Sequence, residues 1–110
     1  MKPILPSMKE SRRYLAFHID KRLQFEDAKS KIDKLFKEQV GTLGMARANL
    51  KLIENLFEGD KGVIAVSPNF VNELVFSLAL SEDPRFKTLG VSGVVNKTKR
   101  FLNKKVEGGM

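Results

Sequence analysis

The chain has 110 residues, the length of a single domain, and its 42% hydrophobic and 30% charged residues are typical of a globular protein, not of a disordered one. The absence of cysteine excludes disulfide bonds and thiolate metal sites and favours an intracellular, cytoplasmic location, and no apolar run is long enough for a membrane-spanning helix. The formal net charge of +7 has the sign expected of a protein with a polyanionic partner.

An extended arm and a strand are predicted first. Residues 1–11 contain two prolines and little periodicity, so we expect an arm without a helix there. A single domain is predicted over residues 12–110. It begins with a strand over residues 12–20, where apolar Leu15, Phe17 and Ile19 recur with the period of two that is typical of a half-buried strand.

A helix is predicted next, from Phe25 to Gly41 or Gly44, because glycine is a common helix end. Glu26 and Asp27 lie in its first turn, where carboxylates stabilise the helix dipole. Its apolar residues fall on one face at helical spacing. They are Phe25, Ala28, Ile32, Leu35, Phe36 and Val40.

Two strands, over residues 48–57 and 63–67, are predicted to form a hairpin through the turn at residues 58–62. A second helix should begin at Ser67 and Pro68, with the Ser67 hydroxyl as N-cap, and end at residues 81–84. Its apolar face consists of Val71, Leu74, Val75 and Leu78. A last strand over residues 87–94 and a helix over residues 96–105, with Phe101 and Leu102 as its apolar contacts, complete the chain.

This order of elements predicts the fold class. Strand, helix, strand, strand, helix, strand is the β-α-β-β-α-β order of an α+β fold, the ferredoxin-like α/β sandwich that RNA-recognition-motif domains share. The additional C-terminal helix is basic. In this topology the fourth strand lies antiparallel beside the first, so the start of the first strand neighbours the end of the fourth.

Positive charge is concentrated at the two ends of the chain. Residues 1–22 carry a net charge of +4 and residues 85–110 a net charge of +6, whereas residues 23–84 carry −3. The predicted topology brings both basic segments to one edge of the sheet, where like charges repel unless a polyanion neutralises them. We therefore predict RNA-backbone contacts from Arg12, Arg13, Lys97, Lys99, Arg100, Lys104 and Lys105.

The segment Thr88–Phe101, TLGVSGVVNKTKRF, allows other interpretations. Its glycines have the wrong spacing around Ser92 for a nucleophile elbow, and the chain's one histidine, His18, lies within the first strand. The P-loop pattern is absent, and the anion loop of acylphosphatases follows the first strand of that fold rather than the last. A structural role remains, in which Gly90 and Gly93 allow close backbone approach or a bulge in an inner strand and Ser92 caps the next helix.

Other candidate sites are weaker. A lone histidine without cysteine is a poor metal site. Glu58 and Asp60 fall in a predicted turn and read as a solvated hairpin tip, not as a catalytic pair. RNA-recognition motifs stack bases on strand aromatics, and here Tyr14 and Phe17 are the available rings, so recognition of RNA backbone and shape is the better match.

Four segments carry a resemblance to a known family. RRYLAF, LKLIEN, KGVIAVSPNFVNELVFSLAL and TLGVSGVVNKTKRFL resemble archaeal ribonuclease P protein component 2, whose eukaryotic relatives occur in ribonucleases P and MRP. The resemblance spans residues 12 to 102 and implies the sandwich fold. It also implies a non-catalytic subunit of the endoribonuclease that matures the 5′ end of tRNA, in which RNA is the catalyst and uses Mg²⁺. No catalytic residue and no cofactor of the protein itself are implied.

The resemblance also implies partners. These are the ribonuclease P RNA and a TIM-barrel-like protein subunit, in an assembly of two heterodimers around a central dimer of this chain. Ile53 and Phe57 are weak candidates for the face that binds the protein subunit. The rival hypothesis is a protein-interaction adaptor whose basic ends only improve solubility, and a third is an enzyme in its own right.

Overall fold

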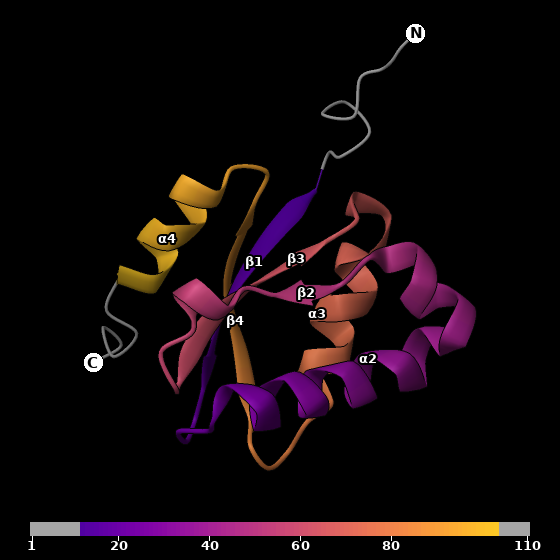
Figure 1. The fold of residues 1–110 in the computed structure, drawn as a ribbon, viewed down its shortest axis with the longest axis horizontal. Helices are drawn as coiled ribbons and strands as arrows, with labels where there is room; N and C mark the ends of the chain where they lie inside the picture. The colour runs from indigo at the N-terminus through magenta and orange to yellow at the C-terminus, as the bar shows by residue number, and fades with distance from the viewer. Residues whose placement is uncertain (1–11, 104–110) are drawn as a thin grey trace, which may run out of the picture.

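The computed structural model describes residues 12–103 (Figure 1). The predicted arm over residues 1–11 and the positions of Lys104 and Lys105 lie outside these residues. In chain order the elements are β1 (Arg13–Ile19), α2 (Phe25–Ala48), β2 (Lys51–Leu52), η1 (Glu54–Leu56, a 3₁₀ turn), β3 (Lys61–Val66), η2 (Pro68–Phe70, a 3₁₀ turn), α3 (Val71–Ala79), β4 (Phe86–Ser92) and α4 (Val95–Asn103).

The strands form one antiparallel sheet in the order β2-β3-β1-β4. The predicted neighbourhood of the first and last strands is confirmed, because Tyr14 pairs with Ser92 and Ile19 with Phe86. The prediction that the last strand is an inner one is wrong, since β4 forms an edge of the sheet. An α+β fold with a four-stranded antiparallel sheet and three α-helices is therefore established for the described residues.

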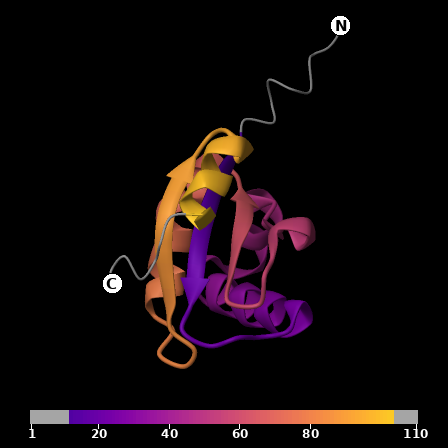
Figure 2. The same cartoon turned by 90° about the vertical axis from the view of Figure 1, so that its left-hand side faces the viewer.

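Helices cover both faces of the sheet. α2 and α3 lie on one face and α4 on the other (Figures 1 and 2). The strand alternation explains this arrangement: Leu15, Phe17 and Ile19 of β1 point into the main core with α2 and α3, whereas Ala16 points into a smaller core with α4. All four of these side chains have no exposed surface, so β1 is buried from both sides.

The predicted end of the first helix is only partly right. Gly41 leaves the helical conformation at φ 76° and ψ 177°, which kinks α2, but the helix resumes and continues through Gly44 to Ala48. Position 44 within this helix has room only for glycine, because a Cβ atom there would overlap the side chain of Val40. The helix finally ends at Asn49, which adopts the left-handed conformation at φ 53°.

The predicted strand over residues 48–57 is largely wrong. Because α2 extends to Ala48, only Lys51 and Leu52 pair with β3, and the chain then turns into η1. The predicted N-cap role of Ser67 is also wrong: its side chain makes no capping hydrogen bond, and a 3₁₀ turn precedes α3. The other strands and helices agree with the prediction to within a few residues.

Candidate nucleic-acid interface

The start of β1 and the turn from β4 into α4 lie side by side. Tyr14 pairs with Ser92, and the Arg13 guanidinium lies over Gly93, where Nη1 would be 3.2 Å from an added Cβ atom. Arg13 is exposed. The predicted convergence of the basic N-terminal segment with the basic C-terminal segment is therefore confirmed for Arg13, although about eighty residues separate the two in sequence.

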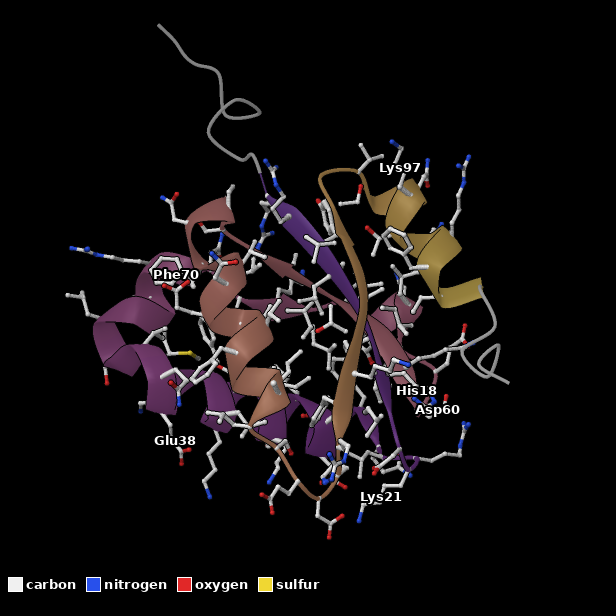
Figure 3. All side chains as sticks on the ribbon, turned by 180° about the vertical axis from the view of Figure 1, so that it is seen from behind. His18, Lys21, Glu38, Asp60, Phe70 and Lys97 are labelled. Carbon is white, nitrogen blue, oxygen red and sulfur yellow. The ribbon has the colours of Figure 1, made fainter. Side chains whose placement is uncertain are left out.

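Helix α4 presents cations to solvent. Lys97, Lys99 and Arg100 are all exposed, and Figure 3 shows Lys97 on α4. Thr98 is completely buried and Leu102 is 4% exposed. At about 100° of rotation per residue, the three cations spread around the half of the helix that faces away from the sheet. No carboxylate interrupts them within α4. We call Arg13, Lys97, Lys99 and Arg100 the cationic ridge.

The turn before α4 confirms the structural interpretation of its small residues in part: the close approach at Gly90 is present, but Ser92 bonds to Val94, which precedes the helix, and does not cap the first turn of α4. The Ser92 hydroxyl accepts a hydrogen bond from the Val94 backbone N–H at 3.0 Å, which shapes the entry into the helix. A Cβ atom at Gly90 would lie 2.6 Å from the ring of Phe101. The register of β1 with β4 also shifts between Ala16 and Phe17, which is the predicted irregularity.

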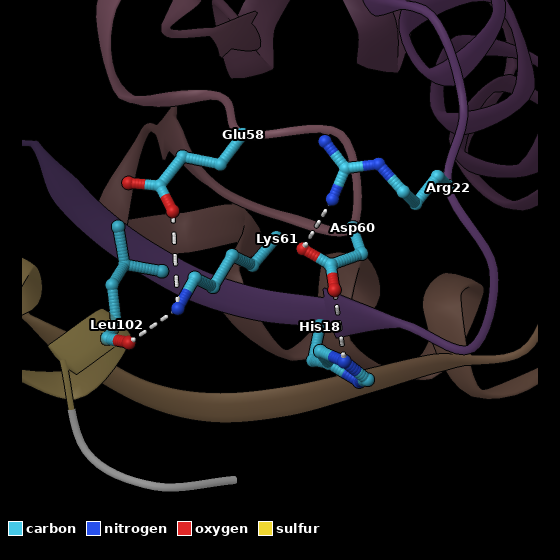
Figure 4. Close-up of polar contacts among 6 residues, drawn as sticks. All are labelled: His18, Arg22, Glu58, Asp60, Lys61 and Leu102. Carbon is cyan, nitrogen blue, oxygen red and sulfur yellow. Dashed lines mark hydrogen bonds and ion pairs between the residues drawn. The ribbon is translucent and has the colours of Figure 1, made fainter.

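The far end of α4 is held by a lysine from β3. Lys61 Nζ donates a hydrogen bond to the carbonyl oxygen of Leu102 at 3.1 Å and lies 3.8 Å from Glu58 Oε1 (Figure 4). A cation at this end also stabilises the helix dipole. Sequence reasoning missed Lys61, because a contact 41 residues distant leaves no local signal.

Arg12 points elsewhere. Its Nη2 donates a hydrogen bond to the backbone carbonyl of Asn49 at 2.5 Å, so its guanidinium lies at the C-terminal end of α2. The side chain is half-buried, unlike that of Arg13. Arg12 is therefore held by a contact with the end of α2 and is not part of the cationic ridge.

The face of the sheet under α4 does not form an open stacking platform. Tyr14 is half-buried and packs against the small core of Ala16, Val63 and Leu102, and Phe17 is buried in the main core. The two aromatic rings of β1 are thus both occupied by packing. This placement agrees with the sequence-based preference for recognition of RNA backbone and shape.

The alternative sites are not assembled. His18 of β1 pairs with Lys87 of β4, whereas Ser92 pairs with Tyr14, four residues earlier in β1. His18 and Ser92 are therefore separated by about 13 Å along the strands. His18 Nε2 instead lies 3.7 Å from Asp60 Oδ2, and Asp60 also lies near Arg22 (Figure 4). Within residues 12–103, no group of three or more His, Asp and Glu side chains is placed to hold a metal ion.

An open hollow of about 570 Å³ lies between the start of α2 and η1. Its polar lining, which includes Arg22, Asp27 and Glu54, has mixed charge. It lies near the end of β1, away from the cationic ridge at the start of that strand. Its charges therefore do not extend the ridge.

Ile53 and Phe57 are not free surface residues. Phe57 packs edge-on against Phe25, with 5.7 Å between ring centroids, and Ile53 packs against the smaller core. The large apolar side chains that are exposed in the described part of the chain are Leu43, Phe76, Leu80, Val91 and Val94. No helix in residues 12–103 is long and apolar enough to cross a membrane.

Comparison with known proteins gives a consistent picture. No family model matches the chain. It is 33% identical over 110 residues to ribonuclease P protein component 2 of Pyrococcus furiosus, covering 93% of this chain and 92% of the relative. The proteins of the same name from Pyrococcus abyssi and Thermococcus gammatolerans are 31% and 30% identical, and the matches cover 94% and 86% of this chain and 94% and 85% of the relatives.

The fold has a counterpart among solved structures. A chain in the cryo-EM structure of yeast ribonuclease MRP superposes with a TM-score of 0.62, at 13% sequence identity, over 97% of this chain and 94% of that one. At that identity the likeness shows the fold alone. The sequence relatives show more, because they are similar over nearly their whole length, and this chain therefore belongs to the ribonuclease P protein component 2 family.

Proposed function

We propose that this chain is a non-catalytic RNA-binding subunit of ribonuclease P, which assists the catalytic RNA in cleaving pre-tRNA to generate the mature 5′ end. Membership of the protein component 2 family supports the assignment to ribonuclease P. The exposed cationic ridge supports the RNA-binding role within that enzyme. The observation that carries the RNA-binding part is the placement of Arg13 at the turn that leads into an exposed basic helix free of acidic residues.

The proposed mechanism is electrostatic. A polyanionic substrate and a polyanionic catalyst repel each other, and lysine and arginine side chains between or beside them lower that repulsion. Such contacts would also stabilise the active fold of the catalytic RNA and reduce the Mg²⁺ that it needs. In this proposal Mg²⁺ belongs to the RNA, and the protein binds no cofactor of its own.

The proposed RNA contacts are centred on the cationic ridge. Lys104 and Lys105 follow α4 in the sequence and extend the proposal beyond the described residues. Arg12 is included only through those guanidinium N–H groups that do not bond to the Asn49 carbonyl. Each contact is with phosphate oxygens, for which a solvated lysine or arginine needs no base-specific geometry.

The fold and the partners belong to the same proposal. We assign the sheet order β2-β3-β1-β4 with its two helices on one face to the ferredoxin-like sandwich. The proposed partners are the ribonuclease P RNA and a TIM-barrel-like protein subunit, with a central dimer of this chain in a heterotetramer. The proposed location is the cytoplasm.

Charge reversal on α4 tests the RNA contacts. We expect K97E/K99E/R100E to weaken binding to a structured RNA and to lower the slope of log affinity against log salt by about 0.7–0.9 for each lost phosphate contact. The matched control is K34E/K37E/R47E, which makes the same change in charge at exposed residues of α2. Equal loss of slope in both variants would show that net charge, and not the ridge, binds RNA.

Reconstitution tests the function as a whole. Catalytic RNA that is inactive at moderate Mg²⁺ should cleave pre-tRNA when this chain and its protein partner are added together. The purified protein without RNA should leave the same substrate intact. Cleavage by the protein alone would instead identify an enzyme in its own right.

A protein-interaction adaptor is the second candidate. Phe76 of α3 is 55% exposed, and Leu80, which directly follows α3, is 46% exposed. The two residues are four positions apart, and such exposed apolar side chains favour some protein contact. A filter-binding titration with structured RNA at two salt concentrations separates the candidates. An adaptor would show no salt-dependent binding of the RNA.

A further inference from the structure

Resting on the proposed function, we infer that the ligand of the cationic ridge is double-helical RNA and that Gly90 and Phe101 are positioning residues that create this preference. They hold α4 on the sheet, so that its cations meet the RNA in a fixed arrangement. The two residues carry no charge and need not touch RNA themselves.

The contact between Gly90 and Phe101 requires glycine because of space. Three ring carbons of Phe101 lie 2.6–2.8 Å from the place where a Cβ atom of residue 90 would be, closer than real Cβ contacts allow. The backbone of Gly90 is not in the left-handed region, so conformational freedom is not the reason. Any larger residue at position 90 must displace the ring of Phe101, and we expect this displacement to loosen the packing of α4 on β4.

Other contacts fix α4 along its whole length. Ser92 orders the turn that precedes the helix, and Lys61 donates a hydrogen bond to the carbonyl oxygen of Leu102 near the end of the helix. Between them, buried Thr98 and Leu102 face the sheet, and Leu102 packs against Ala16 and Val63. The helix is therefore held at its first turn, its middle and its end, and Phe101 is the aromatic ring that α4 itself contributes to that contact.

A fixed helix presents its cations at fixed spacing. Lys97 and Arg100 are separated by about 4.5 Å along the helix axis, and Lys99 lies on the adjacent side of the exposed surface. A rigid array loses little conformational entropy when it meets an equally rigid phosphate backbone. Duplex RNA offers such a backbone and is recognised mainly by shape and phosphate contacts.

Single-stranded RNA lacks a matching site here. Its tight binding needs aromatic side chains on which bases stack. The helix lies across the sheet face where Tyr14 is half-buried, and Phe17 is buried on the opposite face, so neither ring of β1 offers an open stacking surface. The same docking of α4 thus favours duplex RNA and disfavours stacking of single strands.

The experiment compares full-length wild-type protein with G90A, using a labelled RNA duplex and one of its strands alone. Wild type should bind the duplex more tightly than the strand. In G90A, if docking falls to about a tenth of molecules, duplex affinity should fall about tenfold. Single-strand affinity and the salt slope should stay unchanged, because the charge is the same. Amide hydrogen exchange in α4 should rise in G90A, which reports undocking independently of RNA.

Two further variants keep the test decisive. F101A removes the ring without disturbing the β4 backbone, and it should lose duplex preference as G90A does. N96A changes an exposed, uncharged residue of the same helix and should leave the preference intact. If G90A does not fold, F101A carries the test alone.

The inference is overturned if wild type binds both RNAs equally, if α4 stays protected in G90A, or if α4 undocks while the preference for duplex persists. Failure of wild type to bind either RNA is a different result, because it removes the proposed RNA-binding function itself.

Discussion

At the scale of single residues, two neighbouring arginines have separate tasks. Arg12 donates to the carbonyl of Asn49 at the end of α2, whereas Arg13 lies exposed over Gly93 beside the turn into α4. Arg12 precedes β1 and Arg13 is its first residue, and the two guanidinium groups reach different neighbours. The pair therefore offers a direct comparison between stabilising the fold and binding RNA.

We expect R12A to lower the free energy of unfolding by about 1 kcal/mol, since it removes a hydrogen bond from a charged donor at a helix end. R13A should leave unfolding within about 0.5 kcal/mol of wild type, as exposed substitutions usually do. In RNA titrations R13A should lower the salt slope by about 0.9, the value for one duplex phosphate contact. Urea unfolding and filter binding measure the two effects, and a stability loss in R13A without a binding loss would reverse this assignment.

At the scale of elements, α2 is interrupted but not ended at its first glycine. The apolar face from Phe25 to Val40 packs on the sheet, and after Gly41 the helix changes direction and continues to Ala48. Gly41 lies in a region of φ and ψ that is available essentially to glycine. The backbone conformation at the kink is therefore one that glycine adopts without strain and that other residues do not.

The variant G41A should lose about 1–3 kcal/mol of stability through backbone strain alone, because nothing lies within 4 Å of the added methyl group. Urea denaturation should show a lower midpoint with an unchanged slope. T42A, at the exposed neighbouring residue, is the matched control and should change stability by no more than about 0.5 kcal/mol. A G41A protein as stable as wild type would mean that this kink can straighten without cost.

At the scale of the whole molecule, opposite faces of the sheet carry different features. The face with α2 and α3 contains the main core and leaves Phe76 and Leu80 exposed, whereas the face with α4 carries the cationic ridge. The cations of α4 have no acidic residue beside them in that helix, whereas α2 carries both lysines and carboxylates, so net positive charge is concentrated at α4. This separation leaves room for an RNA and a protein to bind to one molecule without competing.

The segment beyond α4 extends the charged surface in the proposal. If Lys104 and Lys105 each contact one phosphate, K104A/K105A should lower the salt slope of RNA binding by roughly 1.4–1.8. The fold should be unaffected, with unfolding in urea within about 0.5 kcal/mol of wild type. K29A/K34A, two exposed lysines of α2, is the control. An unchanged slope in K104A/K105A would remove these lysines from the interface.

Local patterns predicted a large part of this fold. The period of two at Leu15, Phe17 and Ile19 placed β1, the helical spacing from Ala28 to Val40 placed α2, and the order of elements placed the ends of β1 and β4 together. These features succeed because each depends on neighbours along the chain or on a small set of possible topologies.

Long-range contacts decided the remainder. β2 is short because α2 extends to Ala48. Arg12 is directed by its hydrogen bond to the carbonyl of Asn49. The docking of α4 depends on Gly90 and Lys61. By itself the sequence determined the order of elements and the basic character of both chain ends. Only the tertiary structure decided which cations share one surface, because that depends on contacts between residues that are dozens of positions apart.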